Sequence, residues 1–170
     1  MVKNMIKKYS ILLLLVCSIS FGLSYSAESK VASDSEVLSW TDNCLEKLKP
    51  IQNMKSLADW EKNQAIIREF EEWVNRSNMT KQIKSTALVV LYSHAFGFWS
   101  NMSFAVDMNN LLAIKQKRKL THEEEEHLNK ALMHGSGMNT SGVTIERIEK
   151  EMDIISDKIS KIKSELLNKN

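Results

Sequence analysis

The chain is poor in the residues that make turns: its 170 residues include one proline and five glycines. Folds built from many short strands need these residues between the strands, because glycine accepts positive φ angles and proline fixes φ. Their scarcity argues against a turn-rich β fold. Apolar residues instead recur at spacings of three and four, which is the periodicity of a helix face. The sequence therefore predicts an all-α fold, a single helical bundle of four to five helices.

Cysteine is almost absent as well, since the chain contains only Cys17 and Cys44. Cys17 lies in an N-terminal segment that we expect to be removed, which leaves a single thiol. One thiol cannot form an intramolecular disulfide, even in an oxidising compartment. Cys44 lies one helical turn from Trp40 and from Leu48, so we expect a small buried apolar residue. A disulfide-linked dimer is the alternative.

Residues 1–26 have the three parts of a cleavable signal peptide. A cationic start (Lys3, Lys7, Lys8) is followed by an uncharged apolar stretch (Ile11 to Phe21) and two small residues (Ser24, Ser26). The apolar stretch is shorter than the roughly 20 residues that span a bilayer. We therefore expect cleavage before Ala27 and export of the mature chain, which would be periplasmic or secreted. The lysine-rich start favours a bacterial host.

Two other fates of this segment stay open from the sequence. It could be retained as an N-terminal anchor, or it could be lipidated at Cys17, although Val16 stands where lipidation requires a small residue. Residues 27–32 form a polar leader. The helical domain is expected over residues 33–168.

The chain also lacks a strong net charge. It has 23 basic and 21 acidic side chains, a formal charge of +2. Three lysines leave with the signal peptide, so 20 basic residues face 21 acidic ones and the mature chain has a formal charge of −1. Binding to nucleic acid requires a basic surface that neutralises phosphates. The charge balance therefore argues against a nucleic-acid partner.

Motifs for catalysis and cofactor binding are missing. No serine lies in a glycine-flanked turn, and no glycine-rich loop follows a strand pattern. The HExxH motif of zinc proteases places two histidines four residues apart, about 40° around a helix. Here His122 and His127 are five residues apart, about 140° around a helix. We expect no enzymatic activity, no cofactor and no small-molecule substrate.

A weaker pattern suggests metal binding as an alternative function. His122, His127, His134 and Met138 offer imidazole and thioether ligands that copper or zinc can accept. His127 and His134 share a helix face but lie about 10 Å apart along it, too far for one centre unless the loop contributes. Periplasmic binding of copper or zinc through these residues is our second functional hypothesis.

Local signals predict where the helices begin and end. Three starts have capping residues: Ser33 with Glu36, Ser56 with Asp59, and Thr121 with Glu124. Three ends are expected: at Pro50, near Asn75 to Asn78, and at Gly135, where the loop 135–142 begins. Together these signals divide the domain into separate helices with short connections.

The segment 85–106 contains no charged residue if His94 is neutral, and it is long enough to cross a bilayer. It also contains several serines and an asparagine, which lower the gain from insertion into lipid. We expect a central helix covered on all sides by its neighbours. If this helix continues to Lys119, a bend is expected near Gly97 or Ser100. Membrane contact through this segment is the third functional hypothesis.

The C-terminal segment 145–166 has the strictest apolar repeat. Its apolar positions alternate in steps of three and four: Ile145, Ile148, Met152, Ile155, Ile159, Ile162 and Leu166. This heptad pattern predicts one long helix with a single apolar seam. The seam can pack inside its own domain or pair with another chain, and both alternatives stay open. Ile154 and Leu167 widen the stripe slightly, which favours the first.

The leading functional hypothesis follows from these observations. We expect an exported, non-enzymatic helical protein that acts through protein–protein interaction or self-association. The interaction surface would be the heptad seam or a groove beside the helix 85–106. An adaptor, a chaperone, an inhibitor or immunity protein, and a secretion-apparatus subunit all match this description. The sequence selects none of them.

Overall fold

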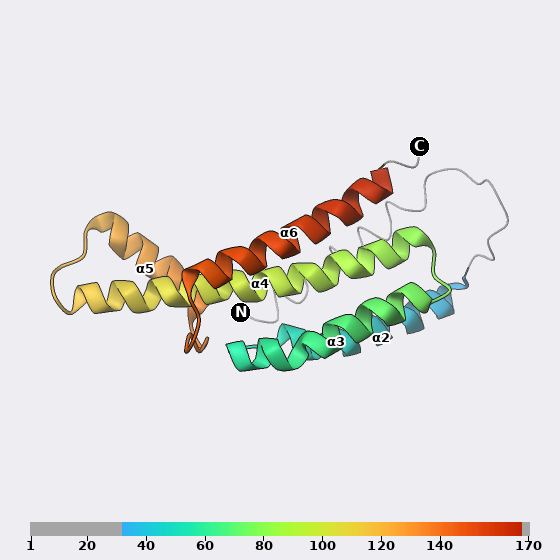
Figure 1. Cartoon of the computed structure of the whole chain (residues 1–170), viewed down its shortest axis with the longest axis horizontal. Helices are drawn as coiled ribbons and strands as arrows, with labels where there is room; N and C mark the ends of the chain where they lie inside the picture. Colours follow the sequence, from blue (N-terminus) through green and yellow to red (C-terminus); the bar gives the residue numbers. More distant parts are fainter. Residues whose placement is uncertain (1–31, 168–170) are drawn as a thin grey trace. The chain divides into compact units, whose positions relative to one another are not determined.

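A long central helix organises the fold. The computed structural model describes residues 32–167, and these contain five helices, labelled as in Figure 1. They are α2 (Asp34–Gln52), α3 (Leu57–Arg76), α4 (Lys81–Lys115), α5 (His122–Gly135) and α6 (Ile145–Leu167). No strand occurs between residues 32 and 167, where the only bridge pairs Ser56 with Asn139. The predicted all-α bundle is confirmed. The segment 1–26 lies outside the described residues.

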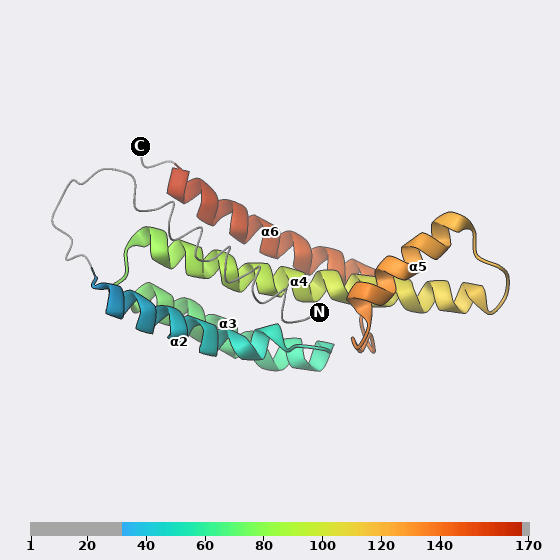
Figure 2. The same cartoon turned by 180° about the vertical axis from the view of Figure 1, so that it is seen from behind.

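Helix α4 contacts each of the other four helices. Helices α2 and α3 pack on each other and on one side of α4, while α6 lies along another side (Figures 1 and 2). Helix α5 folds back along the C-terminal part of α4. Among the described helices, the backbones of α5 and α6 approach only α4.

The predicted helix starts are confirmed by their capping bonds. The Ser33 amide donates to the Glu36 carboxylate at 2.8 Å, and the Thr121 amide donates to the Glu124 carboxylate at 2.8 Å. In both pairs the N-cap hydroxyl accepts the amide of the glutamate. Each capping box therefore satisfies amides that would otherwise lack partners at the helix start. The Ser56 hydroxyl accepts from the Asp59 amide at 3.1 Å in the same way.

The predicted end of the first helix at Pro50 is wrong, because α2 continues through Pro50 to Gln52. Proline lacks an amide hydrogen, so it removes the bond to the carbonyl of Glu46. Within the last turn this loss concerns one bond, and the Asn53 amide closes the helix on the carbonyls of Ile51 and Lys49. The ends of α3 at Arg76 and of α5 at Gly135 agree with the sequence expectation.

Helix α4 ends at Lys115, short of Lys119, and it continues as a helix through Gly97 and Ser100. A methyl group added at Gly97 would meet nothing within 4 Å, so no neighbour displaces the backbone there. Glycine alone lowers helix propensity but keeps the backbone hydrogen bonds, which explains why the helix does not break.

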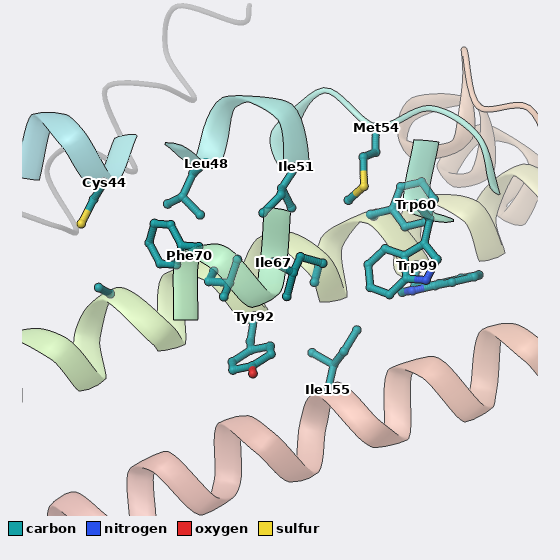
Figure 3. Packing of buried hydrophobic residues seen from close by; sticks show 14 of the residues in the cluster. Cys44, Leu48, Ile51, Met54, Trp60, Ile67, Phe70, Tyr92, Trp99 and Ile155 are labelled. Carbon is teal, nitrogen blue, oxygen red and sulfur yellow. The ribbon is translucent and has the colours of Figure 1, made fainter. Parts of the chain in front are cut away.

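The core forms where α2, α3 and α6 converge on α4 (Figure 3). The ring of Trp60 stacks on Phe98 with centroids 5.5 Å apart, and its edge meets Trp99 at 5.2 Å. Cys44 is buried in the same cluster as predicted, and burial raises the pKa of its thiol to about 12. A protonated, buried thiol is poorly placed for the disulfide-linked dimer.

Candidate functional site

The heptad seam of α6 lies against the core of its own chain. Ile148 and Ile155 are each only 3% exposed, and Met152, Ile159 and Ile162 pack partly buried against the same cluster. The two ends of the seam are its most exposed positions, at Ile145 and Leu166. The partner of the seam is α4. In the structure, therefore, the middle of the seam packs within its own chain and is only partly accessible, at Met152, Ile159 and Ile162.

The predicted metal ligands have separate neighbours. His122 faces Glu126, His127 faces Asp107, the ring of His134 lies on Phe104, and Met138 packs against the core. The closest of these polar contacts joins His127 Nε2 to Asp107 Oδ2 at 3.3 Å. Within residues 32–167, no three side chains of His, Cys, Asp or Glu are grouped so as to hold a metal ion.

The uncharged segment 85–106 lies within α4, and its large side chains face the neighbouring helices. Leu91, Trp99 and Met102 are fully buried. His94 forms a side-chain hydrogen bond with Gln52 at 3.1 Å, and burial lowers the pKa of the imidazole. Across residues 32–167, no helix combines the length and the apolarity needed to cross a membrane.

A hollow lies between α3, α4 and α6, beside the segment 85–106. It has a volume of about 210 Å³ and is open to solvent. Eight residues line it: Glu71, Asn75, Leu88, Tyr92, Lys158, Lys161, Ile162 and Glu165. We call it the Tyr92 hollow. The backbones of α3 and α6 do not approach each other, so side chains alone bridge the two helices over α4.

Three of these side chains form a hydrogen-bonded triad. The Tyr92 hydroxyl, which Figure 3 shows pointing from α4 toward α6, donates to the Glu71 carboxylate. Lys158 Nζ donates to the Tyr92 hydroxyl at 2.9 Å and lies 3.4 Å from the Glu71 carboxylate. Burial, together with the hydrogen bond to Glu71 and its charge, raises the pKa of Tyr92. The phenol therefore stays protonated and links an anion to a cation without carrying charge itself.

Sequence reasoning missed this triad because Glu71 and Lys158 are 87 positions apart. The available signal was a second stripe on α6: Lys158, Lys161 and Glu165 follow each other at spacings of three and four, beside the apolar seam. That pattern places the three residues on one face of α6. It does not identify the helix that this face approaches.

A second surface is the arm formed by α5 and the C-terminal part of α4, residues 104–135, which we call the α4–α5 arm. Its buried residues, Ala105, Leu120, Leu128 and Ala131, do not belong to the main core cluster. Arg118 pairs with Glu124 through two bonds of 2.6 and 2.8 Å at the turn of the arm. The Arg118 hydrogen bond is the main cause that lowers the pKa of Glu124 to about 2. The arm thus has its own small core and its own ion pair.

Large apolar side chains are exposed on this arm: Leu112 is 37% exposed, Leu132 42% and Met133 75%. His127 and Asp107 meet on one edge of the two antiparallel helices. Leu112 and Leu132 each lie five residues after one member of that pair, which is about 140° around the helix. Both leucines therefore lie toward the opposite edge, and Met133 is the most exposed side chain beside them.

The chain matches no model of a known protein family, no curated protein and no solved structure. The two surfaces are therefore interpreted from their own residues and geometry.

Proposed function

We propose that this chain is an exported, non-enzymatic helical protein that acts by binding another protein through the α4–α5 arm. Export rests on the signal pattern of residues 1–26. The partner would contact the edge of the arm that carries Leu112, Leu132 and Met133. This proposal keeps the predicted mode of action and transfers the contact from the heptad seam to a surface that is free.

One observation carries the proposal. Helix α5 contributes no side chain to the main core cluster, yet it exposes two neighbouring large apolar side chains, Leu132 and Met133. Exposed apolar groups favour a protein contact, and methionine is enriched at such contacts. The apolar surface that α5 leaves exposed is therefore our candidate for the binding surface.

The close contact between α5 and α4 supports the same interpretation. A Cβ atom at Gly135 would lie 2.4 Å from the backbone nitrogen of Ala105, so only glycine allows this approach. The arm is therefore held in one geometry by its backbone packing as well as by the Arg118–Glu124 pair. A rigid surface loses less entropy on binding than a mobile one.

The test is chemical cross-linking followed by affinity purification of the tagged chain from the cells that export it. Wild type is compared with a Leu132→Glu, Met133→Glu double variant and with Leu38→Glu. Leu38 is 65% exposed on α2, so it is a matched control for an apolar-to-acidic change away from the arm.

Wild type and the control should capture the same partner, and the double variant should capture at least tenfold less. Circular dichroism should show the same helicity in all three chains. Equal capture by the double variant would overturn the assignment of the arm.

A further inference from the structure

We propose that the Tyr92 hollow is a binding site for a carboxylate group attached to an apolar side chain. This inference goes beyond the proposed function, because the hollow lies between α3, α4 and α6 and shares no residue with the α4–α5 arm. Three features carry it: a surplus of positive charge, an apolar floor, and a pre-formed hydrogen-bonded wall.

The surplus of charge comes from four lysines. Lys158 and Lys161 line the hollow, Lys81 Nζ donates to the backbone carbonyl of Glu165 at 3.1 Å, and Lys84 Nζ donates to the carbonyl of Asn75 at 2.8 Å. The α6 lysines thus line the hollow, whereas the α4 lysines lie at its rim, bonded to carbonyls of lining residues. Two of them are held by carbonyl groups, which bind the ammonium without neutralising it.

Only two carboxylates, Glu71 and Glu165, lie among the lining residues. Glu71 is neutralised by Lys158 and accepts from the Tyr92 hydroxyl. Lys161 and the carboxylate of Glu165 have no ion pair among the described residues. The lining itself is formally neutral, with two lysines against two glutamates. Lys81 and Lys84 bond to carbonyls of lining residues and add two positive charges at the rim, which favour the approach of an anion.

The apolar part of the lining is formed by Leu88 of α4 and Ile162 of α6. Both side chains are partly buried against the core cluster. They form an apolar floor whose outer side is exposed to solvent. Inorganic phosphate would gain nothing from such a floor. An anion that carries a branched aliphatic group would cover it and would gain about 25 cal/mol for each Å² of apolar surface removed from water.

The Glu71–Tyr92–Lys158 triad forms the hydrogen-bonded wall of the hollow and holds it rigid. Lys158 Nζ also lies 4.7 Å from the centre of the Tyr92 ring, so the ammonium is held in place by the ring and by two oxygen atoms. A lysine has three donors, and two of them have acceptors here. The third donor is free for the ligand, and little side-chain entropy remains to be lost on binding.

The volume of about 210 Å³ fits a single small group rather than a drug-sized ligand. Two sources of the same chemistry meet this condition: a free aliphatic acid, and the C-terminal carboxylate of a peptide that ends in an apolar residue. Because the hollow is open to solvent, the rest of a peptide can extend outside it.

The experiment is a titration of the ¹⁵N-labelled exported chain followed by NMR. The probes are N-acetyl-leucine and N-acetyl-leucinamide, which share the aliphatic group and differ in the charge. The acid should shift the backbone amides of Leu88, Tyr92, Lys161 and Ile162 in a saturable way. The amide should bind at least tenfold more weakly, and inorganic phosphate should leave the same signals in place.

The matched variants are Lys161→Glu and Lys163→Glu. Both change the net charge equally, but Lys163 does not line the hollow. Lys161→Glu should weaken binding of N-acetyl-leucine at least tenfold, while Lys163→Glu should change it less than twofold. Equal binding of acid and amide, or an equal loss in both variants, would overturn the proposal.

A tetrapeptide ending in leucine, with a free or an amidated C-terminus, distinguishes the two sources. Tighter binding of the free peptide than of N-acetyl-leucine identifies a peptide terminus, and binding of the small acid alone identifies a free acid. The Leu132→Glu, Met133→Glu variant should bind the acid as wild type does. Failure of the hollow and failure of the arm can therefore be told apart.

Discussion

At the scale of single residues, two polar side chains of the uncharged segment have hydrogen-bond partners on other helices. Tyr92 and His94 are two positions apart on α4, so they leave the helix on different sides. Tyr92 meets Glu71 and Lys158, whereas His94 meets Gln52 at the end of α2. Tyr92 and His94 thus connect α4 to α3, α6 and α2 by polar contacts.

The burial of His94 predicts a loss of stability in mild acid. Burial lowers the pKa of the folded imidazole below its usual 6.5, so the unfolded chain takes up a proton that the folded chain does not. The stability that neutral, partly buried His94 contributes is complete above pH 6.5. It is lost as the pH falls from there toward the pKa of the folded state. Urea unfolding between pH 7.5 and 5 should show a smaller decline for His94→Gln than for wild type. Parallel curves would contradict this origin of the pH dependence.

At the scale of helices, capping signals are reliable because they depend on residues within one turn. Both predicted capping boxes form. Gly135 is more instructive, since the sequence identified it only as a helix end. Gly137 and Gly142, and not Gly135, have the positive φ angles that a turn requires. Gly135 is required because the backbone of α4 lies against it.

Two glycine-to-alanine variants test this contact. In Gly135→Ala the new methyl group would lie 2.4 Å from Ala105 N, an overpacking that should cost about 1–3 kcal/mol. Gly97→Ala is the control, because nothing lies within 4 Å and alanine favours a helix interior by about 1 kcal/mol. Thermal unfolding should show opposite signs for the two variants. An unchanged stability of Gly135→Ala would mean that α5 can move away from α4 without a loss of folding free energy.

At the scale of the whole molecule, α6 completes the core from the side opposite to α2 and α3 (Figure 3). Its seam packs on α4, and the Arg147–Glu61 and Lys158–Glu71 ion pairs connect it to α3. The strict heptad pattern is therefore used within one chain, although such a narrow stripe is also typical of pairing between chains.

Neighbouring isoleucines of α6 provide a direct test of this arrangement. Ile155 is 3% exposed and Ile154 is 43% exposed. Ile155→Ala should lower the free energy of unfolding by about 2–5 kcal/mol. Ile154→Ala should change it by less than about 1 kcal/mol, because surface substitutions have small effects. Urea unfolding at two protein concentrations measures both values. A midpoint for wild type that rises with concentration would show that the seam pairs between chains.

The sequence by itself determined the helical class, the helix starts and the single apolar face of α6, because periodicity and capping act over one or two turns. It also predicted the buried Cys44. The sequence prediction placed the end of α2 too early, at Pro50. The free energy that a proline costs a helix depends on how many helical hydrogen bonds follow it, and few follow in the last turn.

Only the tertiary structure decided which surfaces are covered. The seam faces α4 because α6 returns along the same chain, and no spacing within residues 145–166 encodes that direction. The Tyr92 hollow joins residues from three helices that are far apart in the sequence, and the close contact of Gly135 depends on a neighbouring backbone. Local chemistry fixes each helix, whereas the long-range packing of α3, α5 and α6 on α4 fixes which side chains are left free to bind.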